Sequence, residues 1–578
     1  MDEKKIITGD MIEKRQLSLH TQFGHQVIFK SMGFTGEELS LPRIAVVNSW
    51  SEQSPGHSHL RTISEGVKAG IRMAGGMPFE INTIGPCSVL NGGAEDLLYD
   101  MPQREAILAS IESALHVGFC HGWVGIGSCD KIVPGMLLAA LRLNRPFIFL
   151  GGGQMLPCEF EGERFGYVKG FENIARQHTR MRAGSLSRKE YACEMETVTS
   201  CCGTSAGACG EMTTGNPMQL LTEALGFSIP RSSTSVAVSA EKIWQAKETG
   251  KRIVDLSIRK IRPSEIFTLN SLKNVMAVDM AICGGTNSII HFQSCAHEAG
   301  LNCSIDLWDE ASNRVPALLA VAPSGPHVIY DFHREGGVPV IMKIIENILD
   351  TSCLTVTGKS LADNLANVRP KYSDVIRSLE NPVWEQGALA ILKGNLAPRG
   401  GVCRHTVVEN RALLTKTYKA RVFDTHRDVW DAIQKSVFQD GDVIIYRYQG
   451  PRGGPAMTEC LPLINAMKAK GIRDIPVISD GRFSGWTKGY LAIGNVCPEA
   501  QIGGPLALVR EGDKIRVDIP GRSLDLLVSE AEMARRKQKW TAPDQSGITG
   551  TLLQYAASAL QADQGAGWPV RWKDLDRQ

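Results

Sequence analysis

Residues with different metal-binding preferences follow one another directly after an apolar, strand-like segment. Cys129, Asp130 and Lys131 bring a thiol, a carboxylate and an amine to the end of the segment from Trp123 to Ile126. A thiolate prefers iron, copper or zinc, whereas a carboxylate prefers a hard cation such as magnesium. Open α/β sheets bind their ligands at such strand ends. The sequence therefore suggests a metal site, although a buried cysteine beside a surface ion pair would explain the same residues.

A second stretch that could bind a cluster or an anion runs from Cys201 to Asn216 and contains Cys209. It is rich in small residues and precedes a helical pattern at residues 219–225. Small residues could let the backbone wrap closely around a cluster, or around an anion at the helix N-terminus. A flexible, partly buried loop explains the pattern equally well.

Two glycine-rich loops in the C-terminal half also carry reactive groups. Residues 449–459 end in the carboxylate of Glu459, and residues 479–485 expose the hydroxyl of Ser484 between a bulky residue and a glycine. Taken singly, each loop is typical of a plain turn.

The composition limits the class of protein. A chain of 578 residues exceeds one ordinary core and is expected to form two or three domains. Its 63 Lys and Arg residues nearly balance 61 Asp and Glu residues, so we expect neither a nucleic-acid partner nor a membrane partner. With no signal-peptide-like start and no long apolar run, we expect a cytoplasmic protein. The 15 cysteines lack CxxC and zinc-finger spacing, which argues against a zinc ribbon or a thioredoxin-type site.

The hydrophobic pattern predicts an α/β fold with two domains. After an N-terminal arm, short apolar strands alternate with amphipathic helices, which indicates a doubly wound, mostly parallel sheet within residues 1–375. Residues 376–578 contain β-rich segments separated by turns and predict a β-barrel-like domain with C-terminal helices. Residues 530–539 read as a charged helix, and the tail after it is expected to be loosely held.

Taken together, several stretches resemble the dihydroxy-acid and sugar-acid dehydratase family of iron-sulfur hydro-lyases. The resemblance extends from about Arg43 to Trp540, and its motifs occur in one order. These motifs are Cys129-Asp130-Lys131-Ile132-Val133-Pro134-Gly135, Leu221-Thr222-Glu223-Ala224-Leu225-Gly226, Gly284-Gly285-Thr286-Asn287, Gly394-Asn395-Leu396-Ala397-Pro398, the loop from Gly450 to Glu459, and Ser479-Asp480-Gly481-Arg482-Phe483-Ser484-Gly485.

The resemblance implies that the protein dehydrates a 2,3-dihydroxy acid to a 2-keto-3-deoxy acid. It implies an iron-sulfur cluster, either 2Fe-2S or 4Fe-4S, together with Mg²⁺, and association as a homodimer or homotetramer. By motif position, Cys129 and Cys209 would bind the cluster, and Asp130, Glu459 and a carbamylated Lys131 would bind magnesium. Ser484 would act as the base. The metals would lie in the N-terminal domain, and the barrel would supply Glu459 and Ser484.

The sequence departs from the family pattern at two positions. Gly56 stands where relatives have the first cluster cysteine, and Ser88 stands at or next to the position of an acidic metal ligand. Cys87 could supply the missing thiolate, or His57 or His59 could supply an imidazole.

Three interpretations remain open because of these departures. The site could be altered but working, the chain could be a non-catalytic protein that binds a sugar acid or a partner, or one metal such as zinc could replace the cluster. For a working enzyme, the altered loops favour a sugar acid or a specialised hydroxy acid as the small-molecule substrate.

Overall fold

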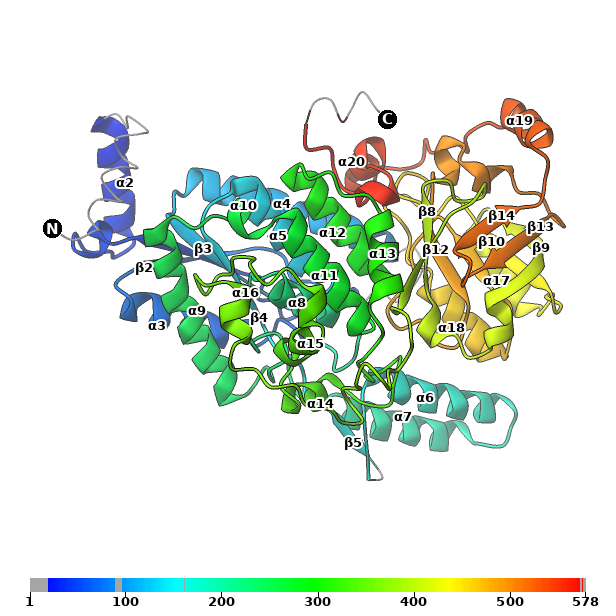
Figure 1. Cartoon of the computed structure of the whole chain (residues 1–578), viewed down its shortest axis with the longest axis horizontal. Coiled ribbons are helices and arrows are strands. Elements are labelled where there is room, and N and C mark those ends of the chain that lie inside the picture. The colour runs from blue at the N-terminus through cyan, green and yellow to red at the C-terminus, as the bar shows by residue number, and fades with distance from the viewer. Residues whose placement is uncertain (1–18, 89–95, 161, 572–573, 575–578) are drawn as a thin grey trace.

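The computed structural model describes residues 19–88, 96–160, 162–571 and 574. The N-terminal part of the chain is built around a four-stranded sheet, and the C-terminal part is built around an eight-stranded sheet. The two parts lie side by side, and α2 (Leu19–Ser31) projects from the N-terminal end (Figure 1). Residues 1–18 of the expected arm and residues 89–95 of the loop after β2 lie outside the described residues.

The N-terminal sheet has the strand order β2-β1-β3-β4, and every neighbouring pair is parallel. Helices connect its strands, and the apolar residues of α3 that recur at helical spacing are buried. The doubly wound sheet inferred from periodicity is therefore confirmed. Because the strands are parallel, the loops that follow them meet at one edge. The elements are β1 (Arg43–Asn48), α3 (Leu60–Met73), β2 (Met77–Asn82), α4 (Asp100–Val117), β3 (Gly122–Gly127), α5 (Ile132–Leu143) and β4 (Phe147–Gly151).

A hairpin of two short strands and a large set of helices complete the N-terminal part. The paired helices α6 and α7 extend below the barrel, and the other helices cover the sheet (Figure 1). These elements are β5 (Cys158–Phe160), β6 (Glu163–Phe165), α6 (Tyr167–Arg182), α7 (Arg188–Cys202), α8 (Gly215–Ala224), α9 (Ala240–Arg259), α10 (Pro263–Ile266), α11 (Leu269–Ala281), α12 (Thr286–Ala299), α13 (Asp306–Arg314), α14 (Ile329–Arg334), α15 (Val338–Ile344) and α16 (Leu361–Leu365).

The C-terminal sheet is a nearly closed barrel with the order β14-β13-β9-β10-β11-β12-β8-β7. Its two edge strands approach each other through a bridge between Lys393 and Ser523. The Asn395 side chain donates to Leu526 O at 2.9 Å and so ties the end of β7 to β14. The strands are β7 (Leu389–Leu392), β8 (Gly400–Arg404), β9 (Thr415–Phe423), β10 (Asp442–Tyr446), β11 (Val477–Ser479), β12 (Ala492–Cys497), β13 (Lys514–Asp518) and β14 (Ser523–Leu526).

The prediction that only turns separate the barrel strands is wrong. Strands β9 to β12 pair in parallel, and a parallel pair needs a long crossover connection. Helix α17 (His426–Gln434) crosses from β9 to β10, and α18 (Leu461–Lys470) crosses from β10 to β11. The barrel is therefore of mixed α/β construction.

Residues 550–566 of the C-terminal tail pack against the rest of the protein, in contrast to the expectation of a loosely held tail. After the predicted helix α19 (Glu530–Lys539), α20 (Gly550–Ser558) leads the chain back onto the N-terminal part (Figure 1). The buried Arg104 of α4 donates to Gly565 O and Ala566 O, both at 3.0 Å. Tyr555 is fully buried there. The tail thus joins the two parts of the chain.

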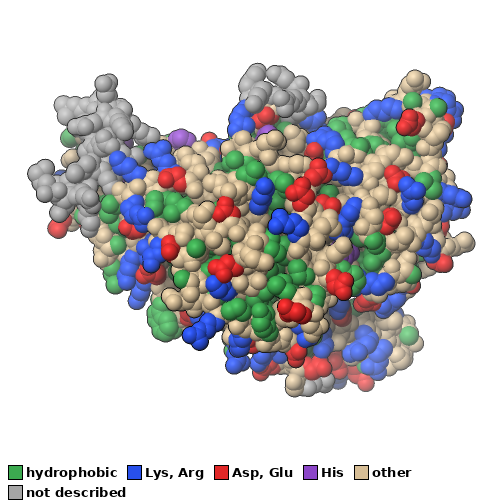
Figure 2. Space-filling model, in the orientation of Figure 1, with side chains coloured by type: hydrophobic (Ala, Val, Ile, Leu, Met, Phe, Trp, Pro, Cys, Tyr) green, Lys and Arg blue, Asp and Glu red, His purple; other side chains and the backbone are tan. Residues whose placement is uncertain are grey.

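The molecular surface agrees with the balanced charge of the sequence. Figure 2 shows basic and acidic side chains interspersed over the visible face, without a large area of one sign. None of the helices within the described ranges is long and apolar enough to cross a membrane.

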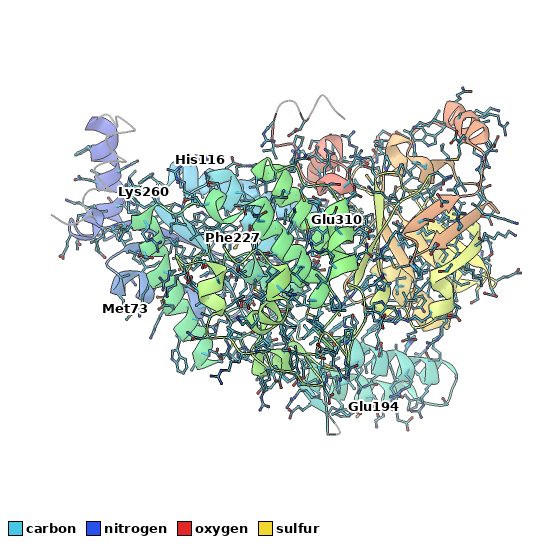
Figure 3. All side chains as sticks on the ribbon, in the orientation of Figure 1. Met73, His116, Glu194, Phe227, Lys260 and Glu310 are labelled. Atoms are coloured by element: carbon cyan, nitrogen blue, oxygen red, sulfur yellow. The ribbon has the colours of Figure 1, made fainter. Side chains whose placement is uncertain are left out.

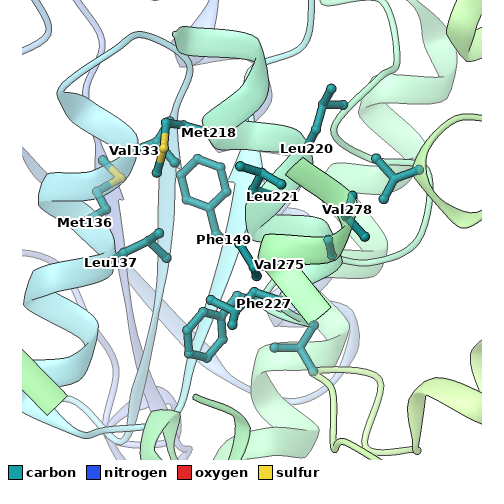
Figure 4. Packing of buried hydrophobic residues seen from close by; sticks show 14 of the residues in the cluster. Val133, Met136, Leu137, Phe149, Met218, Leu220, Leu221, Phe227, Val275 and Val278 are labelled. Carbon is teal, nitrogen blue, oxygen red and sulfur yellow. The ribbon is translucent and has the colours of Figure 1, made fainter. Parts of the chain in front are cut away.

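We expect Phe149→Ala to lower the free energy of unfolding by about 3–5 kcal/mol, because it would leave a cavity in the core of the N-terminal part. Figure 4 shows the Phe149 ring between side chains of α5 and α8, and the residue is 1% exposed. Urea denaturation followed by circular dichroism measures the change. Val117→Ala is the control, because Val117 is 85% exposed and its loss should change little.

Candidate functional site

A cavity of about 460 Å³ lies between the two parts of the chain and brings together most of the predicted site residues. The N-terminal part lines it with thiols and a carboxylate, and the barrel lines it with Glu459 and Ser484. The predicted residues in its wall are Cys87, Cys129, Asp130, Cys209, Glu459 and Ser484. Lys131 lies directly behind the wall, next to Asp130.

The thiols reach the cavity from separate loops. Cys87 follows β2, Cys129 follows β3, and Cys209 lies between α7 and α8. Hydrogen bonding to Cys87 and burial both raise the pKa of Cys129 well above its usual value. Burial, followed by the neighbouring Cys87, also raises the pKa of Cys209. Raised pKa values at Cys129 and Cys209 mean that metal binding by these thiols would be coupled to the release of their protons.

His57 fixes the loop that carries Cys129. Its Nε2 accepts hydrogen bonds from the backbone N–H groups of Ser128 and Cys129, each at 3.2 Å. Its Nδ1 donates to Gly85 O at 3.0 Å, so the loops after β1, β2 and β3 are joined through one ring. Burial lowers the pKa of His57 to about 4, which keeps the ring neutral. With both nitrogens engaged, His57 has no lone pair to offer a metal in this arrangement.

His59 is also used to hold a loop. Its Nε2 donates to Gly152 O at 2.8 Å, which connects the loops after β1 and β4. His59 is not part of the cavity wall. Of the candidates for the missing ligand, Cys87 is therefore the one whose side chain faces the cavity.

Gly56 lies against the Cys129 thiol. A Cβ atom added at Gly56 would be 2.7 Å from Cys129 Sγ. Position 56, where the family pattern has a cysteine, therefore faces the same thiols that Cys87 approaches from the loop after β2. A side chain at position 56 would force Cys129 to move.

The Cys209 segment is tied to its neighbours by its backbone. Gly207 N donates to Pro55 O at 2.7 Å, and Ala208 N donates to Gly153 O at 2.9 Å. Gly207 has a φ of 137° and packs against the chain at Met155, where a side chain would not fit. The segment is shorter than the sequence suggested, because α7 continues through Cys202. Cys201 and Cys202 therefore belong to a helix outside the cavity wall.

Arg482 joins carboxylates from both parts of the protein. The loops that carry Glu459 and Arg482 pair through their backbones, with Arg482 N donating to Thr458 O at 3.0 Å. The guanidinium donates to Glu459 Oε2 through Nη1, and to Asp100 Oδ2 through Nη2 at 2.6 Å. Burial raises the pKa of Glu459, although Arg482 opposes this effect. Asp100 was not among the residues predicted from the sequence, and Arg482 was named only as part of the motif at residues 479–485.

Lys131 is a fully buried amine next to the carboxylates that Arg482 joins. Its Nζ lies 3.6 Å from Asp130 Oδ2 and 3.9 Å from Asp100 Oδ2. It donates no hydrogen bond to any residue in the described ranges. A buried ammonium without an acceptor is costly, so the amine is suited to a further ligand or to modification.

The donor set fits the groups that the resemblance implies. Three thiols and two carboxylates line one cavity, a mixed set of soft and hard ligands that suits an iron-sulfur cluster beside a hard divalent cation. As the side chains stand, no set of His, Cys, Asp or Glu residues in the described ranges surrounds one point closely enough to hold a single ion. Binding therefore requires side-chain adjustment around the carboxylates.

The motif Gly284-Gly285-Thr286-Asn287, which has no reactive group, holds the Ser484 loop against the Cys209 segment. Thr286 Oγ1 donates to Phe483 O at 3.1 Å, and the Asn287 amide donates to Thr214 Oγ1 at 2.9 Å. A Cβ at Gly485 would lie 2.9 Å from the backbone of the Cys209 segment, so the two loops are in direct contact. This contact brings the serine and the thiols to one cavity.

Comparison with known proteins agrees with this geometry. Residues 41–364 match the family model described as dihydroxy-acid/6-phosphogluconate dehydratase N-terminal, and residues 374–566 match the corresponding C-terminal model. The chain belongs to this dehydratase family. It is 43% identical over 551 residues to a dihydroxy-acid dehydratase of Carboxydothermus hydrogenoformans, and 42% identical over 545 residues to that of Pyrococcus abyssi. Each alignment covers 94% of this chain and 97% of the relative.

The family assignment establishes the chemical class. The protein is a dehydratase, that is, a hydro-lyase, in a family that uses iron-sulfur clusters.

We expect His57→Ala to destabilise the site, because it leaves the backbone N–H groups of Ser128 and Cys129 without acceptors at about 1–3 kcal/mol each. The midpoint of thermal unfolding should fall, and Cys129 should become more reactive towards a maleimide reagent. His116→Ala is the matched control, because His116 lies on the outside of α4 (Figure 3). Equal melting temperatures for the two variants would show that His57 does not hold the loops together.

Proposed function

We propose that the protein removes water from a 2,3-dihydroxy acid in the cavity between its two parts and releases a 2-keto-3-deoxy acid. The proposal rests on one observation: thiols, carboxylates and a serine from distant segments of the chain line the same cavity. A protein that only binds a sugar acid would have no need of this combination.

In this proposal Cys87, Cys129 and Cys209 hold the iron-sulfur cluster. Asp130, Glu459 and the carbamylated amine of Lys131 hold Mg²⁺. When bound, the two groups supply Lewis acidity for the departing C3 hydroxyl and for the substrate carboxylate and C2 oxygen. The buried position of Lys131 Nζ supports carbamylation, because a carbamate would replace an ammonium that lacks an acceptor.

Ser484 takes the C2 proton at its Oγ. The backbone N–H of Trp486 donates to that oxygen at 3.2 Å and orients it. Bound cations would depress the serine pKa and favour the alkoxide. As the C2–H bond breaks, its electron pair forms the C2–C3 double bond and the C3–O bond breaks. The departing hydroxide takes the proton that Ser484 Oγ has accepted and leaves as water, which returns the serine to its alkoxide form. The enol that results then tautomerises to the keto acid.

One part of the cavity lining bears on the substrate tail. It consists mainly of aromatic and aliphatic side chains, and its polar groups are Asn465, Lys468, the Tyr167 hydroxyl and the indole N–H groups of Trp430 and Trp486. Tyr167 and Trp486 stack there, with 4.1 Å between ring centroids. An aldonate tail would bury hydroxyls that find few partners on this wall, at about 1–3 kcal/mol each. The lining comprises Tyr167, Phe171, Trp430, Leu461, Pro462, Asn465, Ala466, Lys468, Ala469 and Trp486.

These contacts favour a 2,3-dihydroxy acid with an apolar tail over the sugar acid that the sequence favoured. The names of the relatives support the same choice, since each is described as a dihydroxy-acid dehydratase. We also propose that the chain forms a homodimer or homotetramer. In its support, α2 exposes Phe23 and Ile28, with exposed fractions of 67% and 58%, and Met32 directly after the helix is 58% exposed.

We expect anaerobically purified protein to contain iron and acid-labile sulfide in similar amounts, and both to be lost in Cys87→Ser and Cys129→Ser. The reason is that each variant removes a proposed cluster ligand. Elemental analysis and the visible absorption spectrum measure the change. Cys193→Ser should keep the cluster, because Cys193 is exposed on α7.

Other metal contents would contradict the proposal in distinct ways. Zinc without sulfide would indicate a single-metal enzyme. A colourless protein that binds neither metal after reconstitution would indicate a non-catalytic relative. Iron retained in Cys87→Ser would remove Cys87 from the ligand set.

We expect kcat/KM for 2,3-dihydroxyisovalerate to exceed that for D-gluconate by about ten-fold or more, because only the sugar acid buries unpaired hydroxyls. Coupled detection of the keto acid measures both rates. Cys129→Ser protein should form no product from either substrate, which excludes a contaminating enzyme. Faster turnover of gluconate would restore the sugar-acid assignment.

A further inference from the structure

Asp100 is a buried carboxylate whose position no motif predicts. It is the first residue of α4 and is 0% exposed. One oxygen, Oδ2, accepts from Arg482 and lies 3.9 Å from Lys131 Nζ. The other, Oδ1, is buried and accepts no short hydrogen bond from any residue in the described ranges. An anionic oxygen in this state is a strong site for a cation.

A second buried atom beside Asp100 also lacks a partner. Lys131 Nζ is fully buried between Asp100 and Asp130 and donates no hydrogen bond within the described part of the chain. Burying both atoms without hydrogen-bond partners destabilises the folded protein, and more so for charged groups. A cation bound beside them, with the amine carbamylated, would satisfy both at once.

Ser88 connects Asp100 to the cavity. Ser88 lines the cavity wall, and its side chain interacts with the Asp100 carboxylate. Ser88 therefore stands where a carboxylate would face the cavity, and the buried carboxylate of Asp100 lies next to it.

We infer that Asp100 supplies, through Oδ1, the acidic oxygen for the divalent cation that is absent at position 88. This inference rests on the proposed function, which places that cation beside Asp130 and Glu459. Arg482 supports it by holding Oδ2 and leaving Oδ1 free. It also gives a role to the two fully or nearly buried carboxylates, Asp100 and Glu459, which share the single guanidinium of Arg482.

The test measures Mn²⁺ binding to the full-length protein by isothermal titration calorimetry, with electron paramagnetic resonance of free Mn²⁺ as a second readout. Asp100→Asn should weaken binding by about ten-fold or more. Glu105→Gln is the matched control, because Glu105 is a buried carboxylate of the same helix that pairs with Arg104 at 2.7 Å. Its Mn²⁺ affinity should equal that of the unmodified protein.

A carboxylate exchange makes the test specific. The double variant Ser88→Asp/Asp100→Ser moves the carboxylate to the cavity wall and should recover most of the affinity lost in Asp100→Asn. Circular dichroism and thermal unfolding check that each variant folds. If Asp100→Asn does not fold, the double variant decides alone: binding supports the inference, and a folded protein that does not bind overturns it.

The outcomes separate this inference from the proposed function. If Asp100→Asn binds Mn²⁺ as tightly as Glu105→Gln while Glu459→Gln does not, the inference fails and the proposed cation site stands. If the unmodified protein binds no Mn²⁺, the proposed cation site fails and the inference fails with it.

Discussion

The buried guanidinium of Arg482 is the interaction on which the geometry of the site depends. It belongs to the barrel, yet it pairs with Glu459 of the barrel and with Asp100 of the N-terminal part. Taking such charges out of water is expensive, and removing one partner of a buried pair is strongly destabilising. The two parts therefore cannot shift relative to each other without breaking a paired charge. Since Ser484 follows Arg482 by two positions, the same contact sets the distance between the serine and the thiols.

Hydrogen bonds from residues that do no chemistry reinforce this contact. The buried Arg404 donates to Met212 O at 3.3 Å and to Gly485 O at 3.2 Å, which joins the thiol side to the serine side. Thr286 and Asn287 act in the same way from α12. A sequence motif without a nucleophile, acid or thiol can thus be essential to a catalytic site, because it holds loops that come from different domains.

Short-range patterns in the sequence predicted the sheet, and strand ends predicted where the thiols meet. Apolar spacing identified α3 and the strand before Cys129, because periodicity reports which face of an element is buried. The helices α17 and α18 were missed because the parallel pairing that requires them is a long-range property of the barrel. Asp100 was missed for a similar reason: at the start of a helix an acidic residue usually stabilises the helix N-terminus, and its burial beside Arg482 follows from contacts 382 positions apart in the chain.

The reactive residues of the cavity and the residues that would contact the substrate tail come from different segments of the chain. The reactive residues of the wall come from the loops after β2 and β3, the Cys209 segment and two barrel loops, which are joined by hydrogen bonds. Most of the apolar lining comes from α6, α17 and α18, of which the last two are crossover helices of the barrel. Changes on these helices would alter the fit of a substrate tail without moving the thiols or Arg482. One arrangement of metal ligands can therefore serve substrates with different tails, and the tail preference of this chain must be sought on those helices.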